Sequence, residues 1–303
     1  MSLTIIPFAE GEARLDWIGL TDALAAGHKL PKAEIADTFL YRGKDTLLNR
    51  AAWIDGLGLA VKSATIFPGN AARNEPTING GVTLYRDSDG ALEALVDFHL
   101  VTKWKTAGDS LLGARRLARK DSRNILIIGS GTVACSLVEA YSAAFPDARL
   151  TVWSRTIANA AALANTVPGM AVAEDLERAV KEADIITSAT MATEPNLKGD
   201  WLQPGQHLDL IGAYRPDMRE VDDEALRRSR IFVDSFDTTI GHIGELKIPL
   251  TEGKIVRDDV LADLYEMESM VRRSDDEITL FKNGGGAHLD LMTARYILDR
   301  FRA

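Results

Sequence analysis

Gly129, Gly131 and Ala134 follow the pattern G-x-G-x-x-A directly after an apolar, strand-like run. A glycine at the first position permits a sharp turn, the second lets the backbone approach a phosphate, and a small third residue lets helix and strand pack closely. The amides of a following helix, including those of Thr132 and Val133, face a pyrophosphate with the positive end of the helix dipole. The pattern predicts a dinucleotide-binding turn, with a plain strand-to-helix corner as the alternative.

The next strand-like run ends in Ser154, Arg155 and Thr156. A fold selective for NAD usually carries an acidic residue there, which accepts hydrogen bonds from the ribose hydroxyls. A guanidinium and two hydroxyls suit a 2′-phosphate instead, so NADPH is predicted, with NADH still open and Arg155 as a plain surface charge the alternative. Small residues after a third strand are expected beside the nicotinamide, with a plain polar loop as the alternative: Ser188, Ala189 and Thr190.

An alternation of strand and helix patterns must position these residues. A helix is predicted from Thr106, and strands are predicted at Asn124–Ile128, Arg149–Trp153, Met170–Val172, Ile185–Ser188, His207–Leu210 and Ile231–Val233. Such alternation is typical of a parallel sheet covered by helices on both faces. We therefore expect an α/β fold whose Rossmann-type, doubly wound domain spans residues 114–280.

The first third of the chain has a different pattern. It predicts a helix near Trp17–Leu30 and strands at Asp37–Tyr41, Thr46–Ile54, Leu57–Phe67, Gly81–Tyr85 and Ala91–Asp97, the last two joined by a turn at Arg86–Ala91. An open antiparallel or mixed sheet in a smaller α+β domain follows from this pattern. We expect residues 1–113 to form this substrate domain, completed by the C-terminal helix within 281–303.

Composition narrows the classes of function. The chain has 303 residues, a net charge of −9 and one cysteine, Cys135, which is predicted to be a small packing residue on a helix. The negative charge disfavours a nucleic-acid partner, and a lone cysteine suits a reducing compartment. No secretory signal or apolar run long enough for a membrane span is recognised, and the five histidines are scattered. A cytoplasmic protein with no metal site is predicted.

Several segments together resemble the ornithine cyclodeaminase/mu-crystallin family. They are Gly58–Asn70 ("GLAVKSATIFPGN"), Val101–Ala118 ("VTKWKTAGDSLLGARRLA"), the "GSGTVA" turn, Gly212–Leu226 ("GAYRPDMREVDDEAL") and the C-terminal "DEITLFKNGGGAHLDL". The resemblance implies a Rossmann domain, a second domain that forms a homodimer, and reactions at a carbon–nitrogen bond beside a carboxylate.

Two positions bear on the branch of the family. Tyr214 stands where the cyclodeaminases carry a catalytic aspartate, and Lys105 stands where the family usually has an arginine. The motif that follows Tyr214, Arg215–Glu220 ("RPDMRE"), resembles the motif of mu-crystallin and the cyclic ketimine reductases. The resemblance therefore implies NAD(P)H-dependent reduction of Δ1-pyrroline-2-carboxylate, and also of Δ1-piperideine-2-carboxylate, to L-proline and L-pipecolate.

The same resemblance implies the substrate site. Lys62 and Lys105 are expected to contact the carboxylate or deliver a proton, and Thr77 to bond the same carboxylate. Arg50 is preferred over Arg42 as the substrate arginine. From the residues themselves, Tyr214 is a candidate to donate to the substrate or to pack, and Asn283 to contact ligand or to belong to a plain helix-entry turn. His288 and Asp290 lie two residues apart on a predicted helix, so they do not share a face and a metal site there is disfavoured.

Three other functions remain open at this point. They are ornithine cyclodeaminase, an oxidoreductase like alanine dehydrogenase, and a crystallin-like protein that binds NADPH without turnover. Tyr214 and Arg155 argue against the cyclodeaminase, and the paired lysines argue against silent binding.

Overall fold

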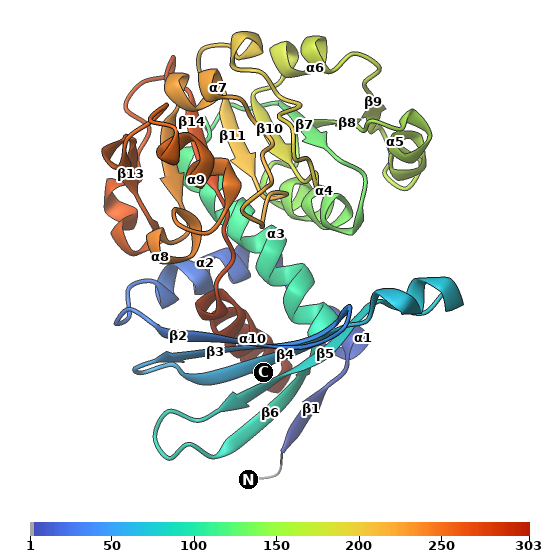
Figure 1. Ribbon diagram of the computed structural model, residues 1–303, viewed down its shortest axis with the longest axis vertical. Coiled ribbons are helices and arrows are strands. Elements are labelled where there is room, and N and C mark those ends of the chain that lie inside the picture. The colour runs from blue at the N-terminus through green and yellow to red at the C-terminus, as the bar shows by residue number, and fades with distance from the viewer. Residues whose placement is uncertain (1–2) are drawn as a thin grey trace. The chain divides into compact units, whose positions relative to one another are not determined.

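The computed structural model describes residues 3–303, which form two compact units (Figure 1). Of the described residues, the first unit comprises 3–105 with 286–303, and the second comprises 106–285. The boundaries predicted from sequence were 113/114 and 280/281. The first observed boundary lies inside helix α3 (Phe98–Leu117), where an uninterrupted helical pattern carries no boundary signal.

The first unit contains a six-stranded sheet in the order β1-β6-β5-β4-β3-β2. Its strands are β1 (Thr4–Ile6), β2 (Glu34–Arg42), β3 (Asp45–Ile54), β4 (Gly58–Ile66), β5 (Ile78–Tyr85) and β6 (Leu92–Asp97). All neighbours pair antiparallel except β1 and β6, so the sheet is mixed, as expected. The unit's helices are α1 (Phe8–Glu12), α2 (Trp17–Gly27), the 3₁₀ helix η1 (Pro68–Arg73), the start of α3, and α10 (Ala287–Arg302).

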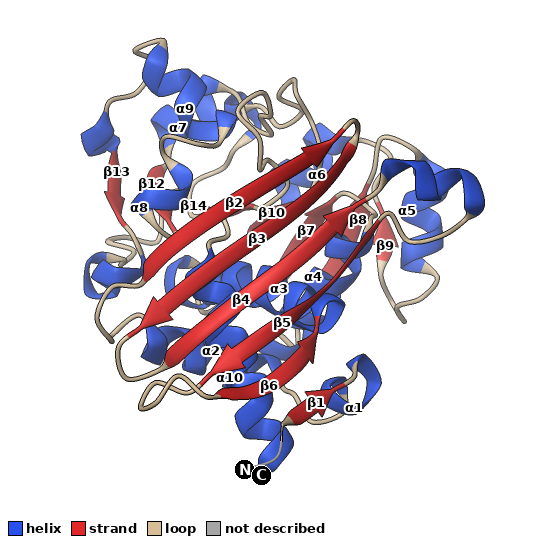
Figure 2. Cartoon of the chain, turned by 60° about the horizontal axis from the view of Figure 1, so that its bottom comes forward, coloured by secondary structure: helices blue, strands red, loops and turns tan. Residues whose placement is uncertain are grey.

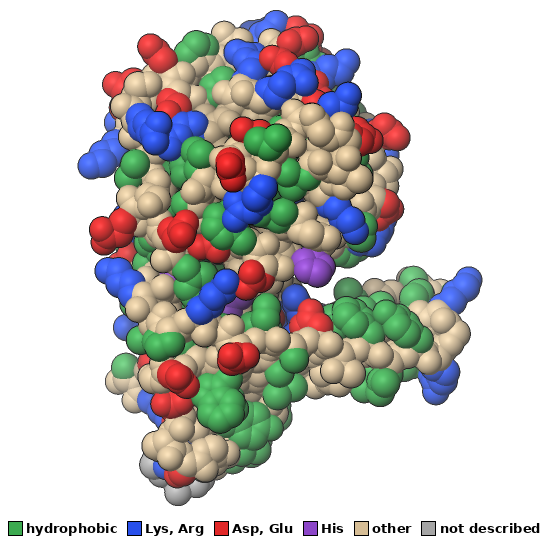
Figure 3. All heavy atoms as spheres, turned by 60° about the vertical axis from the view of Figure 1, so that its left-hand side comes forward, with side chains coloured by type: hydrophobic (Ala, Val, Ile, Leu, Met, Phe, Trp, Pro, Cys, Tyr) green, Lys and Arg blue, Asp and Glu red, His purple; other side chains and the backbone are tan. Residues whose placement is uncertain are grey.

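The two faces of this sheet differ. Within the unit, α10 and α2 lie behind the strands in Figure 2, and the face beneath α10 buries Ala52, Ala60 and Val82. The opposite face carries exposed apolar side chains, among them Leu40, Trp53 and Leu95. Figure 3 shows apolar side chains, in green, gathered on the surface of this unit.

The second unit contains an all-parallel, eight-stranded sheet in the order β13-β12-β14-β11-β10-β7-β8-β9. Its strands are β7 (Asn124–Ile128), β8 (Arg149–Trp153), β9 (Ala171–Val172), β10 (Ile185–Ser188), β11 (His207–Leu210), β12 (Arg230–Val233), β13 (Val260–Ala262) and β14 (Thr279–Lys282). The order reverses between β7 and β10, which is the switch point of a doubly wound fold. The predicted Rossmann-type class is confirmed.

Helices connect these strands and enclose an aliphatic core that includes Ile128, Ile186 and Leu210. They are α4 (Thr132–Ala144), α5 (Ile157–Ala164), α6 (Leu176–Glu182), α7 (Asp223–Arg228), α8 (Phe236–Thr239) and α9 (Gly244–Thr251), with the 3₁₀ helices η2 (Gly199–Trp201), η3 (Arg257–Asp259) and η4 (Leu264–Ser269). Cys135 is exposed on α4, so its predicted packing role is wrong: Ala134, Leu137 and Val138 occupy the buried side of this helix.

Several elements differ from the sequence expectation, among them the unpredicted strands β1 and β13. Helix α3 begins at Phe98 rather than at Thr106, because Asp97 accepts a hydrogen bond from the Leu100 amide (2.9 Å) and caps the helix directly after β6. Lys105 therefore lies in the third turn of α3 rather than at its start. Strand β14 was not predicted, although it pairs with both β11 and β12 inside the sheet.

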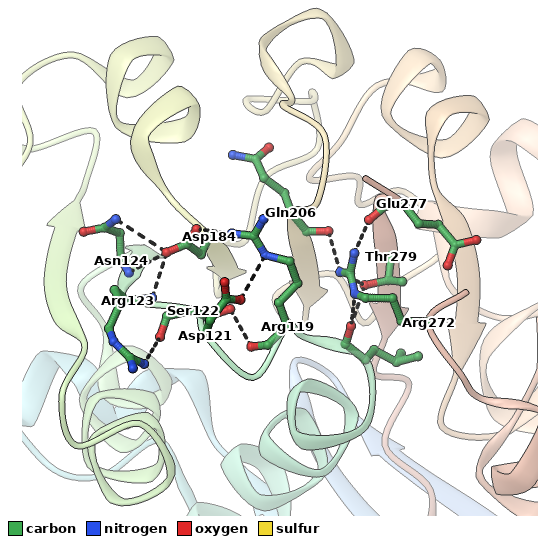
Figure 4. Close-up of polar contacts among 11 residues, drawn as sticks. Arg119, Asp121, Ser122, Arg123, Asn124, Asp184, Gln206, Arg272, Glu277 and Thr279 are labelled. Atoms are coloured by element: carbon green, nitrogen blue, oxygen red, sulfur yellow. Dashed lines mark hydrogen bonds and ion pairs between the residues drawn. The ribbon is translucent and has the colours of Figure 1, made fainter. Parts of the chain in front are cut away.

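A polar network occupies the amino-terminal edge of this sheet (Figure 4). The Asp184 carboxylate accepts hydrogen bonds from Arg119 Nη2 (2.8 Å) and from the backbone amides of Arg123 (2.7 Å) and Asn124 (2.9 Å). These bonds satisfy donors at the start of β7 and tie them to the loop before β10. In a parallel sheet the carboxyl ends of the strands are free for ligand, and this network lies at the other edge.

Candidate functional site

The glycine turn has the geometry that its sequence predicts. Gly129 has a φ of 117°, in the region that favours glycine, and a Cβ there would lie 2.8 Å from the Ala189 carbonyl oxygen. Its amide donates to the Trp153 carbonyl (2.8 Å), which ties the turn to the end of β8. Gly131 is the N-cap of α4, and a Cβ there would meet no atom within 4 Å. The turn is thus packed on one side and open at the helix N-terminus, which fits a pyrophosphate.

The residues after β8 lie beside this turn. The Ser130 hydroxyl donates to the Ser154 hydroxyl (3.0 Å), and Arg155 and Thr156 are exposed. No carboxylate is found among Ser154, Arg155 and Thr156 to bond ribose hydroxyls. An exposed guanidinium at this position can meet a 2′-phosphate without displacing a buried partner.

The ends of β10 and β11 meet at a buried carboxylate that the sequence interpretation missed. Glu220 accepts hydrogen bonds from the Ser188 hydroxyl and from the Thr190 and Gly212 backbone amides. Tyr214, in the same segment, is 59% exposed and has the Arg215 guanidinium 5.6 Å from its ring centre. The sequence pointed to Tyr214 as the functional residue of this segment. In the structure, Glu220 of the same segment binds Ser188 and Thr190, which are predicted to border the nicotinamide.

In the first unit, sheet register brings three charged residues into one row on the α10 side. Asp37, Arg50 and Lys62 are directly paired across β2, β3 and β4. The Arg50 guanidinium binds both Asp37 oxygens (3.1 Å from Nε), and Lys62 Nζ lies 2.9 Å from Asp290 Oδ1 of α10. Lys62 also lies over the Phe98 ring at 4.7 Å. The strand and two helices therefore hold the ammonium in place.

This lysine–aspartate pair is buried, with Lys62 7% and Asp290 1% exposed. Burial lowers the pKa of Lys62, and Asp290 opposes this effect without reversing it. Burial would raise the pKa of Asp290, but the charges of Lys62, Lys105 and Arg50 outweigh it, so this pKa lies below its usual value. Lys105 is itself buried and lies close enough to act on both groups. The site is a cluster of three cations, Lys62, Lys105 and Arg50, with two carboxylates: Asp290 beside Lys62 and Asp37 beside Arg50.

Thr77 and Asn283, two further predicted substrate residues, each have a hydrogen-bond partner within their own unit. Thr77 precedes β5 and its carbonyl pairs with Phe67, five residues along the chain from Lys62, which corresponds to about 16 Å in a strand. Asn283 is buried after β14 and its side-chain amide donates to the Thr106 carbonyl at 3.4 Å. Their contact with the substrate stays a prediction.

Asp290 is the second functional candidate that sequence reasoning missed. His288 and Asp290 have separate environments, since the His288 ring packs edge-on against His28 at 5.4 Å while Asp290 binds Lys62. Among residues 3–303 no group of three or more acidic, histidine or cysteine side chains is arranged to hold a metal ion. The available signal for Asp290 was an acidic residue on the apolar side of an amphipathic helix, which requires a buried partner.

Comparison with known proteins decides the family. The model of the ornithine cyclodeaminase/mu-crystallin family matches residues 53–303. The chain belongs to the ornithine cyclodeaminase/mu-crystallin family. A Δ1-pyrroline-2-carboxylate reductase from Paracoccus denitrificans (strain Pd 1222) is 50% identical over 300 residues, which cover 96% of this chain and 95% of the relative.

Solved structures of similar proteins agree with the fold. The Thermococcus litoralis Δ1-pyrroline-2-carboxylate reductase in complex with NADH and L-proline has a TM-score of 0.89 and 26% identity, covering 98% of this chain and 97% of that one. An archaeal alanine dehydrogenase dimer with bound NAD has a TM-score of 0.89 and 26% identity, covering 99% and 96%. The family resemblance seen in the sequence is thereby confirmed.

Proposed function

We propose that this protein is an NAD(P)H-dependent reductase of cyclic ketimine carboxylates. Its substrates are Δ1-pyrroline-2-carboxylate and the six-membered Δ1-piperideine-2-carboxylate, and its products are L-proline and L-pipecolate. The observation that carries the proposal is the buried Lys62–Asp290 pair, flanked by Lys105, in a chain half identical to a Δ1-pyrroline-2-carboxylate reductase. A heterocycle that carries a carboxylate needs cations of this kind to bind it. A protein that binds the dinucleotide without turnover has no need of them.

When bound, the reduced nicotinamide would supply the hydride for the imine carbon, and the imine nitrogen would need a proton from the protein as the C=N electron pair moves onto it. Lys62 is the proposed proton source, because burial lowers its pKa and Asp290 holds its ammonium at a fixed point. Lys105 and Arg50 are proposed to hold the substrate carboxylate, with Thr77, which the family resemblance implies, and Tyr214 and Asn283 as further contacts. Holding the ring in one orientation lowers the activation barrier for hydride transfer by roughly several kcal/mol, as in other reactions whose reactants are held in place.

NADPH is the proposed cofactor, with NADH as the second choice. Gly129, Gly131 and the amides of Thr132 and Val133 would hold the pyrophosphate, since the turn is open there. Ser154, Arg155 and Thr156 would meet the 2′-phosphate of the ribose, and Ser188, Ala189 and Thr190 would border the nicotinamide. The exposed Arg155 and the missing acidic residue support this preference.

We also propose a homodimer formed through the uncovered face of the first unit's sheet. Trp53, Leu59 and Val61 line an apolar groove of about 460 Å³ on this face. Trp53 is 49% exposed, and such an exposed apolar patch is typical of a protein interface. The related archaeal alanine dehydrogenase is itself a dimer. Sedimentation velocity should show a dimer that becomes monomeric in Val61→Glu and persists in Lys44→Glu, a change on the exposed β2–β3 turn.

The protein contains no helix in residues 3–303 that is long and apolar enough to cross a bilayer. We propose a cytoplasmic location on a separate ground: the single cysteine is exposed and the chain relies on no disulfide.

A spectrophotometric assay tests the reaction. The protein is mixed with NADPH or NADH, and then with each cyclic imine, with pyruvate and an amine, or with ornithine. Oxidation of the cofactor only with the cyclic imines supports the proposal, while oxidation with pyruvate and ammonia would favour an enzyme like alanine dehydrogenase. Ammonia release from ornithine without net cofactor consumption would identify a cyclodeaminase, and cofactor binding without any turnover would identify a silent binding protein.

A further inference from the structure

The feature that the reaction scheme leaves unused is the buried carboxylate of Glu220. Its Oε1 accepts from Ser188 Oγ (2.5 Å), Thr190 N (2.9 Å) and Thr190 Oγ1 (3.0 Å). Its Oε2 accepts from Gly212 N (2.7 Å) and Ala213 N (3.1 Å). One fully buried side chain thus receives five hydrogen bonds, three from the end of β10 and the loop after it and two from the loop after β11.

These two loops lie at the carboxyl ends of neighbouring strands, next to the point where the strand order reverses. A Cβ on Gly212 would lie 2.0 Å from the Thr190 carbonyl oxygen, so the loops are packed backbone to backbone. The β10 loop also abuts the glycine turn, because a Cβ on Gly129 would lie 2.8 Å from Ala189 O. Glu220 therefore fixes backbone that borders the dinucleotide crevice on the side away from β8.

A second carboxylate holds Glu220 in turn. Glu245 of α9 accepts hydrogen bonds from the backbone amides of Glu220 (2.8 Å) and Val221 (3.1 Å) and is fully buried. Burial, and then the charge of Glu220, raise the pKa of Glu245 to about 7, while the charge of Lys282 opposes them. Two carboxylates in one buried place are costly for the fold, and such arrangements concentrate at functional sites.

We propose that Glu220 is a positioning residue for the cofactor: it preorganises the Ser188–Thr190 and Gly212–Ala213 loops to receive the nicotinamide-ribose half of the dinucleotide. This inference rests on the proposed dinucleotide binding and deepens it. Bonds from amides to an ionised carboxylate are stronger than neutral ones, so the loops are already ordered before binding. Little of the binding free energy is then spent on ordering these loops when the cofactor binds.

The decisive variant is Glu220→Gln. It keeps the shape of the side chain, but its single acceptor oxygen can serve only one loop, and its NH₂ group then faces the N–H donors of the other. The matched control is Glu224→Gln, four residues along the same segment, where the carboxylate pairs with Arg227 near the surface. Dissociation constants are measured for NADPH, for NADH, and for adenosine 2′,5′-bisphosphate, which lacks the nicotinamide half.

We expect Glu220→Gln to weaken NADPH and NADH binding tenfold or more, to leave adenosine 2′,5′-bisphosphate binding within twofold, and to raise the KM for cofactor more than the KM for imine. Equal losses for the dinucleotide and the fragment would overturn the proposal, because they would indicate general damage to the unit. Unchanged dinucleotide binding would overturn it as well. Wild-type protein that binds neither ligand would instead refute the dinucleotide function itself.

A second variant covers the case in which Glu220→Gln does not fold. Glu245→Gln leaves one of the backbone amides of Glu220 and Val221 without its acceptor and lies outside the predicted cofactor contacts. A smaller loss of dinucleotide affinity, again without loss of fragment affinity, is expected. Wild-type affinity for both ligands in this variant would contradict a role for the Glu220 network in cofactor binding.

Discussion

Replacing Lys62 by methionine tests the buried ion pair at the centre of the substrate unit. Lys62 Nζ lies 2.9 Å from Asp290 Oδ1, and both side chains are buried. Removal of one partner from a buried pair typically costs about 3–5 kcal/mol of unfolding free energy, because the other charge stays behind without its partner. Lys105 and Arg50 also favour the charged Asp290, so we expect Lys62→Met near the lower end of that range.

The reverse change, Asp290→Asn, should be more costly. It leaves the ammonium of Lys62 buried beside the charges of Lys105 and Arg50, all of one sign. The double variant Lys62→Met with Asp290→Asn removes both charges of the pair. It should therefore lose less than the sum of the single losses, with an interaction energy of about 2–3 kcal/mol.

Urea denaturation followed by tryptophan fluorescence measures these energies. Turnover of the cyclic imine is measured beside it, and we expect both variants that lack Lys62 to lose most turnover while NADPH affinity stays unchanged, since the glycine turn belongs to the other unit. Lys44→Met, at an exposed turn, is the control. Losses that add to within about 0.5 kcal/mol would refute the coupling of the pair. Normal turnover in Lys62→Met would remove Lys62 from the mechanism.

Three further variants test separate parts of the second unit. Arg155→Asp should weaken NADPH relative to NADH by roughly 10- to 100-fold, the worth of a hydrogen bond to a charged group, and equal effects on the two cofactors in binding titrations would contradict the 2′-phosphate contact. Burial raises the pKa of Asp209 from 3.8 to about 6, so its contribution to stability is complete below pH 3.8 and is lost, by about 3 kcal/mol, as the pH rises through 6. Asp209→Asn should therefore gain stability relative to wild type between pH 4 and 7 in urea titrations, and a pH-independent difference would count against this pKa. Asp184→Asn should lower unfolding free energy by about 1–3 kcal/mol and leave cofactor affinity unchanged, because its bonds lie at the amino-terminal edge of the sheet; a marked affinity loss would be the contrary result.

Local pattern was sufficient for much of the nucleotide unit. Strands Asn124–Ile128, Arg149–Trp153, Ile185–Ser188 and His207–Leu210 have the predicted bounds, because each is a short apolar run that ends at a turn residue and alternates with a helix. Strand β14 was not predicted, because its four residues precede a glycine-rich stretch and are too few to show a periodic pattern. Its partners β11 and β12 are also distant in sequence.

The start of α3 shows how a usable signal was overlooked. Asp97 ends β6 and caps the helix at once, so strand and helix follow each other without a loop. A helix N-cap of this kind is readable in sequence as an acidic residue before a helical pattern. The prediction gave Asp97 to the strand alone and placed Lys105 two turns too early in the helix.

The missed functional candidates share a physical cause. Lys62 and Asp290 are separated by 228 residues, and no local pattern joins them. Glu220 lies in a polar, loop-like segment and reads as a surface residue, although it is fully buried. Their roles follow only from tertiary contacts, whereas the positions of Lys62 and of the glycine turn followed from local motifs.

Asp290 and Glu220 act in the same way in the two units, since each buried carboxylate holds hydrogen-bond donors in fixed positions. Asp290 holds a single ammonium of the substrate unit, and Glu220 holds five donors of two loops in the nucleotide unit. Neither carboxylate needs to touch a ligand to affect the reaction, because each fixes the groups proposed to do so. Variants of Asp290 should therefore alter turnover with cofactor affinity intact, while variants of Glu220 should alter cofactor affinity first. This separation distinguishes positioning in each unit from a general loss of fold, which would change both quantities together.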